Sequence, residues 1–286
     1  YSKDYGDKFA AYIKNPATNK FLTVEGDSVV FKAEDFSVNQ KWRVRKSSSG
    51  EYTFISMANG KVLTVMNSSM GYGANVDLAV ADGTDSQKFY LLDSPEGQTL
   101  IKPVYTNYIV DMDTNNFDVH IYPYGTGKTQ KNAQRFELIC FDDPQGELIL
   151  KEDSSFEKSE EYLLGCKDKT SAEEVISAFE NEGIEVFDLS GKKLSKTDSV
   201  STGSKVCLMQ GEAVLDSLTI VIKGDADGNG NISSTDYMRV KGVFLKGTTL
   251  DGAFLKASDV DENGTIGTTD YIRLKSHFLK TYNIFE

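Results

Sequence analysis

The chain has 286 residues, a net charge of −12 and a sequence pI near 4.8. At roughly 100 to 200 residues per domain, this length predicts two or three domains. The excess of carboxylates disfavours nucleic acid as a partner, because affinity for a phosphate backbone rests on Lys and Arg, and it favours cations instead. The sequence contains no run of 18 or more apolar residues, so it predicts no membrane-spanning helix.

The start of the chain and its cysteines say little about chemistry. Tyr1 is not followed by a charged segment and an apolar signal core, so we expect a mature product or an excised fragment. Cys140, Cys166 and Cys207 are too few and too scattered for a disulfide framework, and no CxxC pair indicates zinc or redox work. We expect all three to be buried, small apolar residues.

The first half of the chain carries a threefold repeat. A Gln-x-aromatic triplet recurs every 47 residues, starting at positions 40, 87 and 134. Between the triplets lie short β segments separated by Gly, Asn and Asp turn clusters, and no helical pattern interrupts them. Three copies of about four strands predict a closed all-β body over residues 8–143. We expect its core to contain the triplet aromatics Trp42, Phe89 and Phe136.

The triplets resemble the Gln-x-Trp signature of ricin-type β-trefoil lectins, which also include carbohydrate-binding modules of family 13. Two of the three copies depart from that signature by carrying Phe. In that family each repeat can hold a shallow sugar pocket, built from an Asp on one strand, an aromatic residue on the next hairpin and polar groups near the triplet. The resemblance therefore implies a carbohydrate-binding β-trefoil over residues 1–145.

Only the third repeat matches the family's sugar pocket. Asp111 precedes its triplet by the same 23 residues as Thr64, while a register shifted by one residue would place Val110 there. The first two repeats carry Thr23 and Thr64 at this position, and only the third has an aromatic on the next hairpin. The resemblance implies that Asp111 accepts hydrogen bonds from sugar hydroxyls and that Tyr122 stacks on the sugar's apolar face. The supporting polar residues are His120, Asn132 and Gln134.

A different interpretation of this region also stays open. Asp111, Asp113 and Asn115 could form an ordinary polar turn, in which case the trefoil is a scaffold without a sugar site. Departures from the family pattern in the first two repeats favour this alternative.

Residues 146–223 mix apparent strands with one short helix. Thr170 or Ser171 can cap this helix, and two glutamates in its first turn suit the positive end of its dipole. We expect the helix to end near Gly183 and strands at residues 184–187, 205–209 and 218–222. The last strand runs without a linker into the next region, which predicts rigid coupling. The segment resembles the small β-rich X-modules of cellulosomal proteins, which implies a spacer and stabiliser.

The last part of the chain contains a second repeat, in which residues 225–246 match residues 259–280 at a constant offset of 34. Each copy has the pattern of a twelve-residue calcium loop, with oxygen ligands at positions 1, 3 and 5, Gly at 6, a carbonyl at 7 and a carboxylate at 12. Position 9 is Ser233 in one copy and Gly267 in the other. The predicted ligands for two calcium ions are Asp225, Asp227, Asn229, Asn231, Ser233, Asp236, Asp259, Asp261, Asn263, Thr265 and Asp270.

Both loops end in Asp where an EF-hand has Glu, and we expect no helix before either loop. With this pattern, residues 224–286 closely resemble a type I dockerin, the module that attaches a cellulosomal component to a cohesin on a scaffoldin. The resemblance implies that cohesin contacts Ser234, Thr235, Lys241, Lys246, Thr268, Thr269, Lys275 and Lys280. Helical spacing instead predicts a core between the two helices formed by Tyr237, Val240, Phe244, Tyr271, Leu274 and Phe278.

The sequence thus predicts a multidomain chain: an all-β trefoil, a small β-rich domain with one helix over residues 146–223, and an α-helical dockerin with two F-hand calcium loops. We expect a non-catalytic bacterial component, secreted or at the cell surface, that binds a polysaccharide or glycan and a cohesin during polysaccharide degradation. One alternative is the C-terminal, non-catalytic part of a secreted glycoside hydrolase or other enzyme whose catalytic domain precedes Tyr1. The other is a trefoil that acts only in protein interaction.

Overall fold

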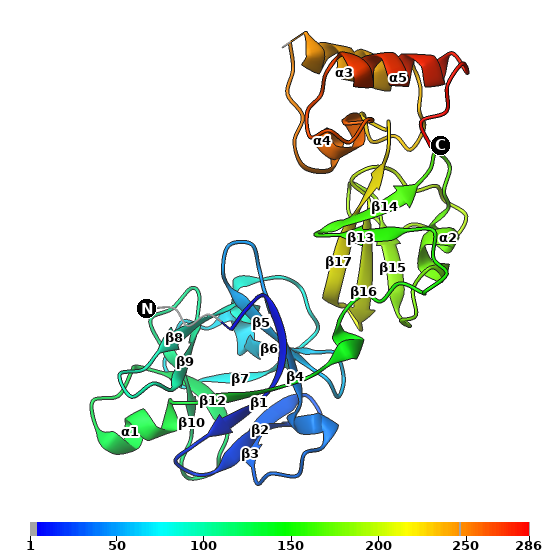
Figure 1. The fold of residues 1–286 in the computed structure, drawn as a ribbon. Coiled ribbons are helices and arrows are strands. Elements are labelled where there is room, and N and C mark those ends of the chain that lie inside the picture. Colours follow the sequence, from blue (N-terminus) through cyan, green and yellow to red (C-terminus); the bar gives the residue numbers. More distant parts are fainter. Residues whose placement is uncertain (1–4, 246, 286) are drawn as a thin grey trace. The chain divides into compact units, whose positions relative to one another are not determined.

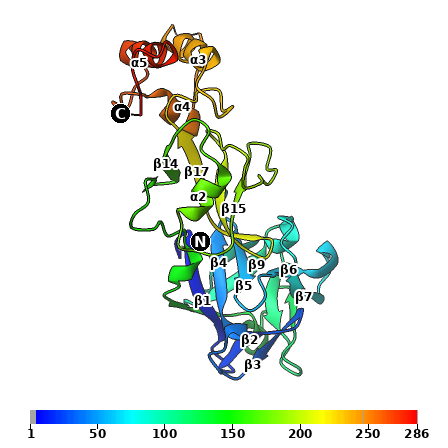
Figure 2. The same cartoon turned by 90° about the vertical axis from the view of Figure 1, so that its right-hand side faces the viewer.

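The computed structural model describes residues 5–245 and 247–285. The chain divides into two compact units, and each is described by itself. The first contains the residues up to Gly146 together with Gln210–Leu215, and the second contains Glu147–Met209 and the residues from Asp216 onward. Figure 1 and Figure 2 show the elements of both units. None of the helices in the described ranges is long and apolar enough to cross a membrane.

Twelve strands joined in one sheet make up the first unit, as the threefold repeat predicts. One short helix, α1 (Lys128–Ala133), follows the last hairpin, which the sequence pattern did not predict. The strands are β1 (Lys8–Asn15), β2 (Lys20–Glu25), β3 (Ser28–Lys32), β4 (Trp42–Lys46), β5 (Tyr52–Ser56), β6 (Val62–Val65), β7 (Ala74–Ala79), β8 (Phe89–Asp93), β9 (Thr99–Pro103), β10 (Ile109–Met112), β11 (Val119–Tyr122) and β12 (Glu137–Phe141).

Strand pairing closes this sheet on itself. The first, fourth, fifth, eighth and ninth strands pair in succession, a bridge between Thr99 and Phe136 continues to the twelfth, and β12 pairs with β1. The remaining strands form three hairpins, β2 with β3, β6 with β7 and β10 with β11. A closed sheet leaves no unpaired edge. The predicted closed body is therefore confirmed.

The triplets hold each repeat together from inside. The three aromatics of the triplets, Trp42, Phe89 and Phe136, are fully buried in one shared core. The Gln40 amide donates to the Thr23 hydroxyl at 3.1 Å, and Gln87 makes the same bond to Thr64 at 3.3 Å. Each triplet thus ties its hairpin to the core, which explains its recurrence.

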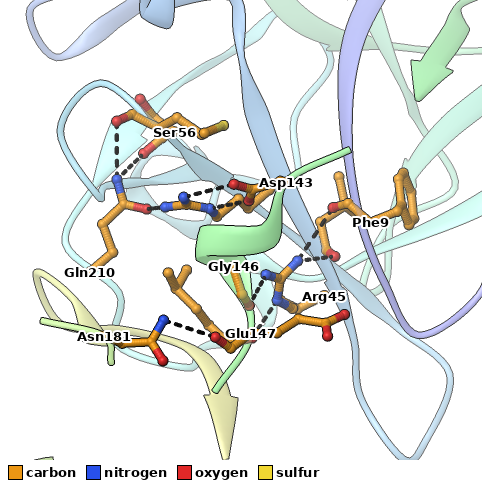
Figure 3. Close-up of polar contacts among 12 residues, drawn as sticks. Phe9, Arg45, Ser56, Asp143, Gly146, Glu147, Asn181 and Gln210 are labelled. Carbon is orange, nitrogen blue, oxygen red and sulfur yellow. Dashed lines mark hydrogen bonds and ion pairs between the residues drawn. The ribbon is translucent and has the colours of Figure 1, made fainter. Parts of the chain in front are cut away.

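The same unit includes the turn at Gln210–Leu215, which two arginines of β4 bind (Figure 3). Arg43 makes an ion pair with Asp143 at 2.5 Å and donates to the Gln210 side chain, also at 2.5 Å. Arg45 donates to the main-chain oxygens of Leu215 and Gly146. These two guanidinium groups thus bind the turn through charge-assisted hydrogen bonds to main-chain and side-chain acceptors.

The second unit begins with a five-stranded sheet in the order β13-β14-β17-β16-β15, where β14 and β17 run parallel. Ser171 caps the predicted helix, and Glu174 completes a capping box. The expected strands are present, but the sequence pattern missed β13 and β14, and the last strand begins at residue 213 instead of 218. The elements are β13 (Glu157–Ser159), β14 (Tyr162–Cys166), α2 (Ala172–Ser177), β15 (Ile184–Phe187), β16 (Lys205–Gln210) and β17 (Ala213–Ile222).

The unit ends in three helices, α3 (Ser234–Phe244), α4 (Gly252–Ser258) and α5 (Thr268–Phe278). Helices α3 and α5 lie side by side (Figure 1, Figure 2). The expectation of no helix before either loop is correct for the first loop, which follows β17, but wrong for the second, which follows α4 directly. Val221 of β17 packs with Ala253 and Ala257 of α4, and these contacts join the sheet to the helices.

Two expectations about buried residues are wrong. Cys140 is exposed, because it lies near the end of β12, beyond the part of its face where Leu138 and its partner Ile13 pack in the core, while Cys166 and Cys207 are buried as expected. Phe244 and Phe278 lie at the C-terminal ends of their helices and are 40% and 44% exposed. The helical core instead contains Val240 and Leu274, with both tyrosines of the repeat, Tyr237 and Tyr271, packed against it.

Candidate calcium and glycan sites

Each predicted calcium loop brings three aspartates together. In the first loop the carboxylates of Asp225, Asp227 and Asp236 offer ligand atoms that all lie within 4.8 Å of one another. In the second loop the corresponding residues Asp259, Asp261 and Asp270 do the same. Three carboxylates at this separation repel one another, and a divalent cation with a preference for oxygen ligands relieves that repulsion.

The carboxylate at position 12 shapes each loop. Asp236 lies in the first turn of α3, is fully buried, and accepts the main-chain N–H groups of Asp227 at 3.1 Å and Ser233 at 2.9 Å. Asp270 makes the same two bonds in the second loop, at 3.0 and 2.8 Å. Asp is short enough to fold back on positions 3 and 9 in this way. The position-12 side chain therefore holds positions 3 and 9 of the loop together beside the ligand cluster.

Burial disfavours the negative charge of the first cluster. It raises the pKa of Asp236 to about 6 and raises the pKa of Asp225, and neighbouring carboxylates add to both shifts. The amide oxygens of Asn229 and Asn263, at position 5, accept the N–H of position 7 in their own loops at 2.8 and 2.9 Å. The residues present fit calcium, which supplies the positive charge that these buried carboxylates lack.

The third repeat of the trefoil forms a pocket of about 200 Å³. Asp111 on β10 pairs across the hairpin with His120 on β11, just as Thr64 pairs with Asp77 in the second repeat. This pairing places Asp111, and not Val110, at the position of Thr64. Asp111 is 8% exposed and its Oδ1 lies 3.0 Å from His120 Nε2, so the ring fixes the carboxylate in the pocket wall.

An aromatic surface borders the pocket. The ring centroid of Tyr122 lies 4.8 Å from that of His120 and 5.6 Å from that of Tyr72. Tyr72 is 67% exposed and comes from the loop before β7, in the second repeat. Sequence reasoning missed it because it compared only equivalent positions of the three repeats, although an aromatic residue between Gly71 and Gly73 was a signal. Two tyrosine rings beside a carboxylate are a surface on which a sugar ring can stack.

Two of the predicted polar residues are not part of the pocket lining. Gln134 is 1% exposed; its amide donates to Pro123 O at 2.9 Å and its oxygen accepts the Gly125 N–H at 2.8 Å. It therefore supports the wall from inside. Asn132 also lies outside the lining, and its main-chain oxygen accepts the Asn15 amide at 2.7 Å. The lining residues are Asp111, Met112, Asp113, Thr114, His120, Tyr122, Thr129, Gln130 and Ala133.

Comparison with known families identifies both end regions. The family model described as ricin-type beta-trefoil lectin domain-like matches residues 38–122, and the dockerin type I domain model matches residues 223–279. The chain carries a ricin-type β-trefoil and a type I dockerin. Type I dockerins bind calcium and cohesin, and the lectin-like domain indicates a glycan as ligand class. Neither domain is catalytic. A dockerin indicates an extracellular, cellulosomal component.

Solved structures include several that are similar to part of this chain. The designed threefold-symmetric protein ThreeFoil is 25% identical, with 46% of this chain and 97% of that chain covered at a TM-score of 0.42. A ricin B-like lectin from Macrolepiota procera in complex with lactose is 14% identical, with coverages of 48% and 99% and a TM-score of 0.41. The exo-β-1,3-galactanase 1,3Gal43A from Clostridium thermocellum is 16% identical, with coverages of 49% and 31% and a TM-score of 0.42. No curated protein matched the chain.

The dockerin helices expose both predicted and unpredicted residues. Ser234 and Thr235 begin α3, Thr268 and Thr269 begin α5, and all four are exposed. Lys241 is half-buried, Lys275 and Lys280 are exposed, and Lys246 lies outside the described residues.

Apolar side chains share these helices, and they recur at the same offset of 34. Met238 and Ile272 are 57% and 53% exposed, and Leu245 and Leu279 are 63% and 57% exposed. The sequence reasoning did not select Met238 and Ile272, although each is apolar and lies off the core face of its helix. Paired exposed apolar residues are typical of a surface that is buried by a partner.

Proposed function

We propose that this chain is a secreted, non-catalytic cellulosomal component that binds a glycan through the third repeat of its trefoil and a scaffoldin cohesin through its dockerin. We assign residues 1–145 to the trefoil, 146–223 to a spacer domain of the X-module kind and 224–286 to the dockerin. The observation that carries the proposal is the joint presence of two complete calcium loops and one trefoil pocket with a carboxylate.

Differences among the three repeats support a single sugar site. In the first two repeats the threonine hydroxyl at the Asp111 position is already bonded to the triplet Gln, and so is committed to the core. Asp111 is held by His120 instead and lines a pocket. A carboxylate has more than one lone pair per oxygen, so it can accept sugar hydroxyls while it keeps its bond to His120.

The exposed helix starts and their apolar neighbours support the cohesin assignment. In this proposal the hydroxyls at the starts of α3 and α5 and the lysines on the same helices contact cohesin. The exposed residues Met238 and Ile272 add apolar area at the middle of each helix. Such a combination of a polar border and an apolar centre is common in specific interfaces.

The experiment that tests this function uses the full chain on a glycan array, followed by titration of the best glycan and of a panel of cohesins with and without a calcium chelator. We expect retention of a specific glycan that does not depend on calcium, and cohesin binding that does. A trefoil that retains no glycan would instead support the scaffold alternative. Hydrolysis of the bound glycan would contradict a non-catalytic role.

A further inference from the structure

The first calcium loop is bonded to a residue that lies outside the dockerin. The main-chain N–H of Thr202, from the segment before β16, donates to Oδ2 of Asp225 at 2.8 Å. Thr202 is itself fixed, because its hydroxyl accepts the N–H of Ile222 at 3.0 Å and lies 3.3 Å from the oxygen of the same residue. Both Thr202 and Asp225 are 0% exposed. A dry, rigid donor from the β-rich region thus orients the ligand at position 1.

The second loop has a different arrangement at the same position. Asp259 is half-buried and accepts the N–H groups of Asn263 at 3.1 Å and Gly264 at 2.7 Å, both from its own loop. Its orientation therefore depends on the loop being folded, whereas the orientation of Asp225 is also set from outside.

The glycines at position 6 show the same contrast. Gly230 has φ +77°, and a Cβ placed on it would lie 2.6 Å from the main-chain oxygen of Val200. Gly264 has φ +86°, and a Cβ there would meet nothing within 4 Å. Both positions need a left-handed backbone, which favours glycine. Only the first is also closed off by a neighbouring segment of the β-rich region.

Position 4 of the loops also differs in sequence. Gly228 occupies it in the first loop, where a Cβ would lie 2.7 Å from the Phe254 ring of α4 and 3.1 Å from the main-chain oxygen of Thr202. The second loop has Glu262 there, with a similar φ of +61°. Close contact with α4 and with the β-rich region leaves no room for a side chain in the first loop, while the second loop accepts a long one.

We propose that residues 200–202 of the β-rich region complete the first calcium site from outside its loop, so that the two calcium ions bind unequally and the first loop binds the tighter. Hydrogen-bond partners that orient metal ligands typically change metal affinity by about 10- to 100-fold. The Thr202 N–H and the close packing around Gly230 reduce the reorganisation that the first loop needs before it can bind.

Two full-length proteins with one working loop each test this inference. Asp259→Ala with Asp261→Ala keeps the first loop, and Asp225→Ala with Asp227→Ala keeps the second. Calcium affinity is measured by isothermal titration, and circular dichroism at saturating calcium checks the fold. We expect the first-loop protein to bind calcium about 10-fold or more tightly than the second-loop protein. Equal affinities, or tighter binding by the second loop, would overturn the proposal.

Variants at the contact between residues 200–202 and the first loop then test whether this contact causes the difference in calcium affinity. Thr202→Pro removes the donating N–H, and we expect it to weaken calcium binding about 10-fold in the first-loop protein while leaving the second-loop protein within about twofold. If proline at position 202 disturbs folding, a matched pair of glycine variants provides the test instead. Gly230→Ala and Gly264→Ala impose similar backbone strain, but only the first also meets Val200. A larger loss of affinity for Gly230→Ala in its own loop supports the proposal, and equal losses contradict it.

Discussion

The hydroxyl oxygens of Tyr237 and Tyr271 lie 2.5 Å apart, and their rings stack with centroids at 5.0 Å. The two residues are counterparts in the 34-residue repeat, so each contacts its own equivalent. Contacts between equivalent residues occur where a twofold axis passes. The dockerin helices α3 and α5 are therefore related by an approximate twofold rotation through this pair.

From this symmetry we predict two orientations of cohesin binding. Ser234→Ala with Thr235→Ala and Lys241→Ala should weaken binding by only about two- to fivefold, because α5 can replace α3, and one lost mode of two equal modes costs a factor of about two. Adding Thr268→Ala, Thr269→Ala and Lys275→Ala should remove binding. Isothermal titration against a matched cohesin measures both. If the first triple variant alone lost all affinity while it kept calcium, the binding would have a single mode.

Removal of calcium should destabilise the dockerin and leave the trefoil folded. The dockerin core is small, with Ala226, Val240, Val260, Leu274 and Ile284 buried, whereas the trefoil has a large closed core. Calcium at about 1,000 times its dissociation constant stabilises a folded form by about 4 kcal/mol per site. Scanning calorimetry with chelator should show two separated transitions, with only the dockerin transition lowered. One transition that the chelator does not move would argue against metal-dependent folding.

For the trefoil we predict that Asp111→Ala weakens glycan binding by about 10- to 100-fold, the usual cost of a hydrogen bond to a charged group. Thr64→Ala is the matched control at the equivalent position of the second repeat. It should lower stability by about 1 kcal/mol through the lost bond from Gln87, and leave glycan affinity unchanged.

A second substitution tests the aromatic surface of the same pocket. Tyr72→Ala and Tyr122→Ala should each weaken glycan binding without lowering the melting temperature by more than a few degrees, because Tyr72 is 67% and Tyr122 38% exposed. Retention of the glycan by the folded Asp111→Ala protein at the parent level would show that the third repeat is not the site.

The cysteines should react with very different rates. Burial raises the pKa of Cys166 to about 12 and of Cys207 to about 11, so both stay protonated at pH 8, and only a thiolate attacks a disulfide reagent. Cys140 is exposed, and although partial burial raises its pKa, its thiolate fraction increases about tenfold per pH unit below that pKa. One fast thiol, lost in Cys140→Ser, is therefore expected with the folded protein, and all three react in denaturant. Three equally fast thiols would contradict the buried positions.

Most of the architecture follows from spacing in the sequence. The 47-residue repeat predicts the closed sheet because the aromatic of each triplet packs in the same core. The 34-residue repeat predicts the calcium loops because all the ligands of one loop lie within twelve consecutive residues. The sequence failed where tertiary packing decides. Cys140 is exposed because it lies near the end of β12, although it shares a face with the core-packed Leu138. Phe244 and Phe278 are exposed because each is the last residue of its helix.

The candidate glycan pocket was likewise predicted only where its residues lie at equivalent positions of the repeats. The cross-strand position of Asp111 and the place of Tyr122 follow from the repeat. Tyr72 belongs to another repeat. Thr129 and Gln130 line the pocket because they lie on the short helix α1, and no hydrophobic periodicity in the sequence predicts this helix. Contacts that cross from one repeat to the next cannot be found by aligning the repeats with one another.

Pairing between β1 and β12 brings the two ends of the trefoil together, with Ala10 opposite Phe141. A short linker could therefore join these ends covalently, and new ends could be opened in the turn between β4 and β5, where one repeat passes to the next. Such a circularly permuted trefoil keeps every strand pair of the closed sheet, so it should fold. The order in which the three repeats follow one another along the chain is thus independent of the fold that they build.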